Sequence, residues 1–123
     1  MIASKLLDSS VWIAYFFEGK CREIIDSREL FLISSISIFE IKKFLMKKNV
    51  SFEEIEKHLS FLRKRSIIQN IDESIVEKAV GFAIEKNLPA IDALIYATAL
   101  QNNAELITLD NDFRNLKDVR ILT

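Results

Sequence analysis

The sequence alternates short apolar runs with longer helix-patterned segments, and this alternation most constrains the fold. Strand-length runs occupy Ser4–Asp8, Leu30–Ser34, Ser66–Ile71, Glu105–Leu109 and Val119–Leu122. Helical patterns occupy Val11–Phe17, Lys20–Ser27, Ser37–Lys48, Ser51–Lys64, Glu73–Lys86 and Ile91–Asn102. Apolar strands separated by helical crossovers indicate a parallel sheet that is covered on both faces. We therefore predict a three-layer α/β/α sandwich around a central parallel sheet of about five strands.

Length and composition fit one domain over residues 1–123. Half of the residues are hydrophobic, nine are Phe, and only two are Gly and one is Pro. This composition supports a packed core and disfavours both disorder and a loop-rich all-β fold. The lone Cys21 has no partner for an internal disulfide, so we expect it to pack as a small apolar residue in a reducing compartment. With no signal peptide or membrane-length apolar segment in view, we expect a cytoplasmic protein without membrane contact.

Three acidic residues fall where the predicted strands end. Asp8 closes the first strand, and Asp110 follows the fourth strand by one residue. Glu40 lies in the first turn of the helix that is predicted after the second strand. In a parallel sheet strands end and crossover helices begin at one edge, which is also where ligands bind. We therefore expect these three carboxylates to lie near one another.

Asp92 gives the strongest single argument for a metal. Its helix reads Ala90-Ile-Asp-Ala-Leu-Ile-Tyr-Ala-Thr-Ala-Leu100, which is apolar on nearly every face and is therefore expected to be buried. An ionised carboxylate there is costly unless it is paired or binds a metal. No Lys or Arg lies within one turn of Asp92 on this helix. Whether Asp92 reaches the same sheet edge depends on the path of Glu73–Lys86, which the sequence leaves open.

Each acid also has a purely structural explanation. Ser37 and Glu40 have the spacing of a capping box. An acid in a first helical turn stabilises the helix dipole, and Asp commonly begins turns and helices. Independent caps need not converge on one sheet edge, whereas a site for a hard cation such as Mg²⁺ or Mn²⁺ requires that convergence. Helix caps, Asp turns and the helix dipole would together account for Asp8, Asp92, Asp110 and Asp112 without a metal.

The other residues of the sequence argue against several other kinds of active site. His58 is the only histidine, so a histidine acid–base pair and a histidine-ligated zinc site are both disfavoured. We expect His58 at the surface of its helix. No Gly-rich phosphate loop and no Gly-flanked serine turn are present. A phosphoacceptor receiver domain would need an acidic pair at the end of its first strand, but residues 2–7 contain no acid.

Basic residues are concentrated in the middle of the chain. The net charge is −1, so clustering of the five acids at one site would leave a positively charged remainder. Such a surface suits a nuclease, although solvated lysines on exposed helix faces are the commoner explanation of such runs. The residues concerned are Lys42, Lys43, Lys47, Lys48, Arg63, Lys64 and Arg65.

Four blocks in order resemble the PIN-domain ribonucleases, specifically the VapC-type toxins of prokaryotic toxin–antitoxin pairs. They are Leu7-Asp-Ser-Ser-Val-Trp-Ile13, Glu40, Asp92-Ala-Leu-Ile-Tyr-Ala-Thr-Ala-Leu100 and Thr108-Leu-Asp-Asn-Asp-Phe113. Together they cover essentially the whole chain. The chain departs from the family in two places: Asn102-Asn103 stands where a glycine is common, and Glu-Ile-Lys-Lys43 has lysine where many relatives have arginine.

The resemblance implies an endoribonuclease that uses Mg²⁺ or Mn²⁺, forms a homodimer and is inhibited by a small antitoxin. The alternative is a non-catalytic PIN-like module that binds RNA or protein. An apolar surplus on the Ser37–Lys64 helix pair, rich in Phe, would mark a docking surface for the antitoxin or a second subunit. The resemblance assigns a metal-binding core of Asp8, Glu40, Asp92 and Asp110, an outer acid Asp112, and orienting hydroxyls Ser10 and Thr108.

Overall fold

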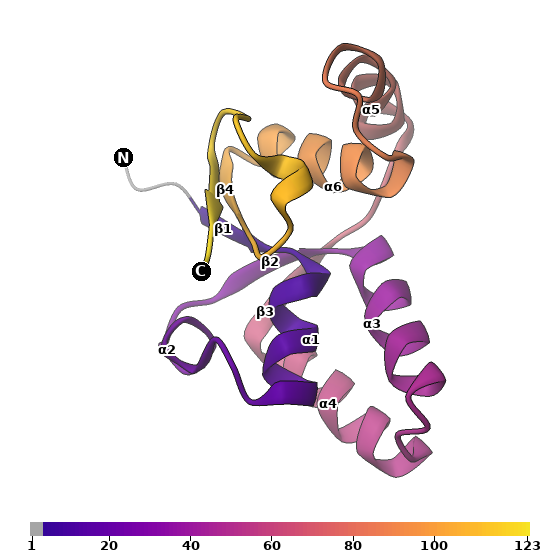
Figure 1. Cartoon of the computed structure of the whole chain (residues 1–123), viewed down its shortest axis with the longest axis vertical. Coiled ribbons are helices and arrows are strands. Elements are labelled where there is room, and N and C mark those ends of the chain that lie inside the picture. Colours follow the sequence, from indigo (N-terminus) through magenta and orange to yellow (C-terminus); the bar gives the residue numbers. More distant parts are fainter. Residues whose placement is uncertain (1–3) are drawn as a thin grey trace.

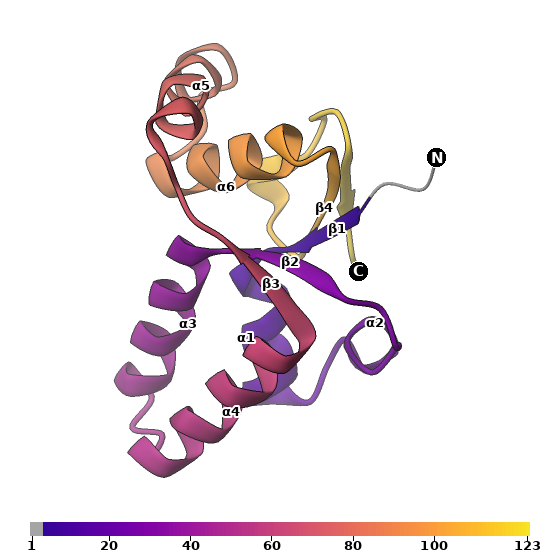
Figure 2. The same cartoon turned by 180° about the vertical axis from the view of Figure 1, so that it is seen from behind.

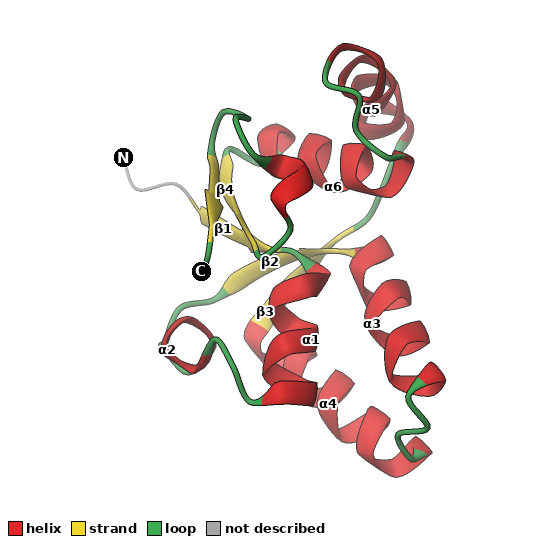
Figure 3. Ribbon diagram, viewed as in Figure 1, coloured by secondary structure: helices red, strands yellow, loops and turns green. Residues whose placement is uncertain are grey.

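The structure is a computed structural model that describes residues 4–123. Its elements form three layers, with the sheet between two groups of helices (Figures 1 and 3). The strands are β1 (Ser4–Leu7), β2 (Phe31–Ser34), β3 (Ser66–Gln69), β4 (Ala104–Thr108) and β5 (Val119–Ile121). The helices are α1 (Ser9–Glu18), α2 (Arg22–Ile25), α3 (Ser35–Lys47), α4 (Phe52–Arg65), α5 (Glu73–Glu85), α6 (Ala90–Gln101) and the 3₁₀ helix η1 (Asn111–Phe113).

The sheet is parallel throughout, with the strand order β3-β2-β1-β4-β5. The chain therefore starts in the centre of the sheet, builds outward to β3, and then returns to the other side of β1. Leu6 in the central strand is in register with Leu32 of β2 and Leu106 of β4. This topology confirms the predicted sandwich and its parallel five-stranded sheet.

Alternate residues of the strands β1, β2 and β4 belong to two separate cores. Leu6 and Leu106 pack against α5 and α6, whereas Leu7 and Ile107 pack against α1, α3 and α4. Figure 2 shows these helix groups on opposite sides of the sheet. Because side chains alternate along a strand, a sheet covered on both faces must be apolar at consecutive positions. The continuous apolar runs of the sequence follow from this burial.

Several helix limits differ from the sequence-based prediction. The helix expected over Lys20–Ser27 is only the single turn α2, since Gly19 and Cys21 both adopt positive φ angles that interrupt the backbone. The helix expected from Ser37 begins at Ser35, because the Ser34 side chain accepts a hydrogen bond from the Ile36 amide. Within residues 4–123, no helix has both the length and the apolar character needed to cross a membrane.

Two local predictions have different outcomes. Ser51 caps α4 by accepting a hydrogen bond from the Glu54 amide, as the capping-box spacing predicted. His58, expected on the helix surface, is partly buried, and its ring stacks on Phe16 with the ring centroids 4.4 Å apart. The aromatic residues of α1 therefore draw His58 into the packing between α1 and α4.

Phe113 anchors the loop that follows β4. Its side chain has no solvent exposure and belongs to the core beneath α6. We predict that Phe113→Ala lowers the free energy of unfolding by about 3–5 kcal/mol, the usual cost of truncating a buried Phe. Phe52→Ala is the matched control, because Phe52 is 71% exposed and should change stability by less than about 0.5 kcal/mol. Urea denaturation measures both values, and equal losses would contradict the anchoring role.

Candidate metal centre

Three of the predicted acids form the tightest cluster in the described part of the chain. One carboxylate oxygen from each of Asp92, Asp110 and Asp112 lies within 4.8 Å of the other two. Asp92 is in the first turn of α6, and Asp110 is the residue before η1. A hard divalent cation binds through such converging carboxylate oxygens. The structure therefore brings Asp92 to the edge where β4 ends, although α5 packs on α6 rather than crossing the sheet.

Asp8 lies beside this cluster and is held by two hydroxyl groups. It follows β1 and is only 4% exposed. Ser10 Oγ donates to Asp8 Oδ2 at 2.7 Å, and Thr108 Oγ1 donates to the same oxygen at 2.8 Å. Ser10 and Thr108, the hydroxyls that the family resemblance proposed, both contact Asp8. These donors replace the water that a buried carboxylate has lost.

The two hydroxyls also connect β1 to the loop after β4. Ser10 Oγ accepts a hydrogen bond from the Leu109 amide at 3.0 Å. Thr108 Oγ1 accepts one from the Asp110 amide at 2.9 Å. Thr108 therefore joins the Asp8 carboxylate to the Asp110 amide, and Ser10 joins the same carboxylate to the Leu109 amide.

Glu40 occupies a different place from the one predicted. It lies in the second turn of α3 rather than the first, because the helix begins at Ser35. The capping-box explanation is wrong, since Ser34 is the N-cap residue. Ser9 Oγ instead donates to Glu40 Oε1 at 2.9 Å. Sequence analysis missed Ser9, although its place between Asp8 and Ser10 at a predicted strand end was the available signal.

The carboxylates repel one another across the site. The pKa of Asp92 is raised to about 7, first by burial and then by the negative charges of Asp110, Asp8, Asp112 and Glu40. Burial is also the main cause that raises the pKa of Asp8. The pKa of Glu40 is raised by burial and by Asp8 and Asp110. All five acids therefore belong to one electrostatic cluster.

A divalent cation fits this donor set. The ion pairs found within residues 4–123 involve none of the five acids. A half-buried group of like charges without a paired Lys or Arg is unfavourable unless protons or a cation neutralise it. Oxygen-only donors select Mg²⁺ or Mn²⁺ over softer metals.

Some of the structural explanations also hold. Asp110 caps η1, since its Oδ1 accepts a hydrogen bond from the Asp112 amide at 2.9 Å. Asp92 faces the positive end of the α6 dipole, after the N-cap residue Pro89. Asp8 precedes α1 but makes no side-chain cap. Capping and clustering therefore coexist at Asp110, where the cap fixes the direction of the carboxylate.

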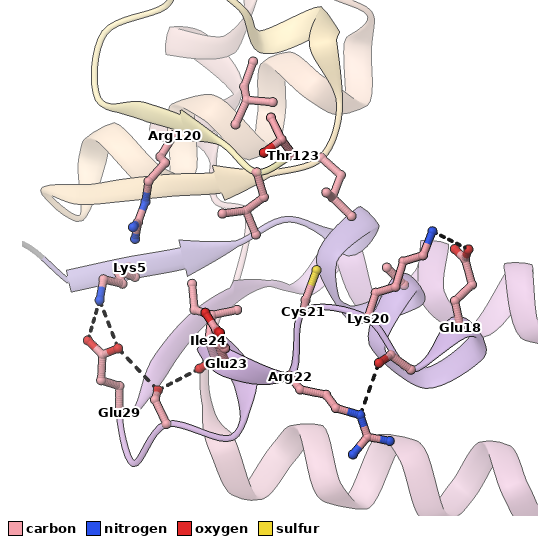
Figure 4. Close-up of a pocket in the computed structure, with 16 residues that line it drawn as sticks. Lys5, Glu18, Lys20, Cys21, Arg22, Glu23, Ile24, Glu29, Arg120 and Thr123 are labelled. Carbon is pink, nitrogen blue, oxygen red and sulfur yellow. Dashed lines mark hydrogen bonds and ion pairs between the residues drawn. The ribbon is translucent and has the colours of Figure 1, made fainter.

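A separate cavity of about 880 Å³ lies between α1, α2 and β5. Its lining includes Lys5 and Lys20, which pair with Glu29 and Glu18, as Figure 4 shows. None of the five clustered acids lines it. The cavity therefore has no direct part in the chemistry of the acidic cluster.

The protein is an α/β domain in which helices cover both faces of a parallel sheet and carboxylates cluster beyond the strand ends. The family model of the PIN domain matches residues 5–119. Because this match covers most of the sequence, the chain belongs to the PIN domain family. The resemblance predicted from the four sequence blocks is confirmed.

Solved structures agree with this assignment. A toxin–antitoxin complex from Klebsiella pneumoniae has a chain that is 27% identical, with a TM-score of 0.80 over 95% of this chain and 96% of that one. VapC20 from Mycobacterium tuberculosis, a sarcin-ricin loop cleaving toxin, is 16% identical with a TM-score of 0.74 over 89% and 92%. VapBC2 from Rickettsia felis, bound to a promoter DNA fragment, is 17% identical with a TM-score of 0.78 over 97% and 98%. No curated protein matches the sequence.

We predict that Thr108→Val lowers the free energy of unfolding by about 1–3 kcal/mol, because it leaves the Asp110 amide without its acceptor and Asp8 with one donor fewer. Thr98→Val is the matched control. Thr98 is also buried, but its hydroxyl donates only to the Leu94 carbonyl within α6, so the loss should stay below about 1 kcal/mol. Chemical denaturation in chelator compares the variants, and equal losses would refute the special position of Thr108.

The pKa of Asp92 predicts how the stability of the metal-free protein depends on pH. The folded-state pKa, raised to about 7 from 3.8, means that the folded protein holds a proton that the unfolded chain releases. Ionisation of Asp92 therefore lowers the free energy of unfolding as the pH rises between those two values. Asp92→Asn should flatten this fall and be more stable than wild type at about pH 8.

Thermal denaturation in chelator at about pH 5 and about pH 8 tests this expectation. Glu77→Gln, an exposed carboxylate on α5, serves as the control and should follow the wild-type profile. If the stability of wild type and of Asp92→Asn changed with pH in the same way, ionisation of Asp92 would not destabilise the folded protein.

Proposed function

We propose that this chain is a divalent-metal-dependent endoribonuclease and the toxin of a toxin–antitoxin pair. The observation that carries the proposal is the unpaired acidic cluster of Asp92, Asp110 and Asp112, with Asp8 and Glu40 beside it, in a PIN domain. The likeness to a chain of a toxin–antitoxin complex supports the biological setting. The likeness to VapC20, described as cleaving the sarcin-ricin loop, supports RNA as the substrate.

The proposed site residues have distinct tasks. Asp92, Asp110 and Asp112 would hold Mg²⁺ or Mn²⁺, with Asp8 and Glu40 completing the acidic surround. When bound, such an ion neutralises phosphate charge and acidifies a water molecule. Ser10 and Thr108 keep Asp8 in place, and Ser9 does the same for Glu40. Attack of water on phosphorus with departure of the 3′-oxygen would leave a 5′-phosphate and a 3′-hydroxyl.

A non-catalytic PIN-like module that binds RNA or protein is the alternative. A module of this kind would have no need for five clustered carboxylates, whose negative charges help to raise the pKa values of Asp92 and Glu40. The cluster therefore favours catalysis. The two functions differ in the presence of chelator, which abolishes cleavage by a metal-dependent enzyme but leaves a simple RNA complex intact.

A small antitoxin and a second copy of the chain are the proposed protein partners. The helix pair predicted to carry an apolar surplus exposes Phe39 and Phe52, while Leu45 and Leu62 are buried. Size-exclusion chromatography of the purified chain tests the dimer, and a monomer at high concentration would exclude it.

We also propose that residues 1–123 form a single PIN-like domain. The proposed location is the reducing cytoplasm, which is consistent with the lone Cys21.

We predict that Asp92→Asn reduces RNA cleavage in Mn²⁺ beyond the 10–100-fold typical of residues that only support a ligand, because it removes a charged metal ligand. The rate is measured on RNA at equal concentrations of folded protein. Glu77→Gln removes an equal charge from the exposed face of α5 and should cleave at the wild-type rate. Undiminished cleavage by Asp92→Asn would overturn the assignment.

A further inference from the structure

An aromatic side chain lies exposed on α3, at the residue before one acid of the cluster. Phe39 is 57% exposed and immediately precedes Glu40, whose carboxylate faces Ser9 and the other acids. Consecutive residues of a helix point in different directions, so α3 carries an acid toward the cluster and an aromatic ring away from it. Exposure of a large apolar ring at this position gives nothing to the stability of the fold.

The ring of Phe39 is associated with a cation rather than with other rings. Lys43 Nζ lies 5.8 Å from the centroid of the ring, within cation–π range. Among residues 4–123, Phe39 takes part in no aromatic pair, whereas Phe17 and Phe44 stack edge to face with each other. Phe39 is therefore not an outlying member of the aromatic core between α1 and α4.

Lys43 links this ring to the acidic cluster. It lies one turn after Phe39 and three residues after Glu40, and its positive charge lowers the pKa of Glu40 against the effect of the acids. Lys47 follows one turn later, and Lys42, Lys43 and Lys47 are all exposed. The outer face of α3 thus presents a ring and a row of cations that begins at the acidic cluster.

We propose that Phe39 and Lys43 form a substrate-positioning platform on which one base of single-stranded RNA stacks while Lys43 contacts the adjoining phosphate. This inference rests on the proposed RNA cleavage and adds two residues that would position the RNA. Stacking on an aromatic ring requires an unpaired base, because bases within a duplex already stack on their neighbours. A cation at the rim also offsets the repulsion between five carboxylates and an RNA phosphate.

Phe39→Ala tests the platform. It should raise KM for cleavage of a short single-stranded RNA by about five- to a hundred-fold, the range of a base–aromatic stack, with little change in kcat. Phe39→Tyr keeps a ring and should restore most of the wild-type KM. Ile84→Ala removes a strongly exposed apolar side chain on α5, away from the helix pair, and should leave both constants unchanged.

A fluorescent base gives a readout that a purely structural role would not move. 2-Aminopurine at successive positions of the same RNA is quenched where it stacks. The measurement uses Asp92→Asn protein, which cleaves the RNA slowly. In this protein the fluorescence of 2-aminopurine at one RNA position should be quenched when residue 39 is Phe or Tyr. The additional change Phe39→Ala should restore the fluorescence at that position. Lys43→Gln should reduce the slope of log affinity against log salt by about 0.7, the value for one phosphate contact on a single strand.

The outcomes separate this inference from the proposed function. Cleavage by wild type with unchanged KM and unchanged quenching in Phe39→Ala overturns the platform while the nuclease assignment stands. A wild-type chain that neither cleaves nor binds the RNA overturns the nuclease assignment and the platform together. An equal rise in KM for Phe39→Ala and Ile84→Ala also overturns the platform, because it indicates a general effect of removing exposed apolar side chains.

Discussion

The repulsion among five carboxylates at one sheet edge is the constraint on which the rest of the structure depends. Holding Asp8 nearly buried beside other acids requires donors in place of water and a backbone that cannot relax away. Ser10 and Thr108 supply the donors, and the parallel strands supply the rigidity. Because β1 and β4 are adjacent in the sheet, the acids that follow them cannot separate without breaking the central strand pair.

Neutralisation of this repulsion couples folding to ligand binding. A cation that binds only the folded arrangement stabilises it by mass action, and it does so most where like charges are closest. The metal-free protein therefore gives up some stability at neutral pH, and the two cores on either side of the sheet make up the difference. The raised pKa of Asp92 has the same origin, because burial and the neighbouring negative charges both favour the protonated form of its carboxyl group.

Periodicity predicted the sheet but not every position within it. Consecutive apolar residues such as Leu6 and Leu7 indicated burial on both faces, and the positions of Asp8 and Asp110 followed from strand ends. The convergence of Asp92 could not be derived, because it depends on how α5 packs on α6, and no local pattern records that contact. Glu40 was misplaced by one turn because Ser34 and Ser37 are equally good caps in sequence, and only tertiary packing selects Ser34.

The two sides of α3 differ in what surrounds them. The side that bears Glu40 is fixed by Ser9 and by the neighbouring acids, so a substitution there disturbs the acidic cluster. The side that bears Phe39 and Lys43 is exposed, and the Lys43 ammonium lies over the Phe39 ring. Substitutions on this exposed face would therefore alter the proposed RNA contacts without altering the acids. The Lys43 side chain suits such a contact, because a compact ammonium binds a phosphate as a point charge rather than through two parallel hydrogen bonds.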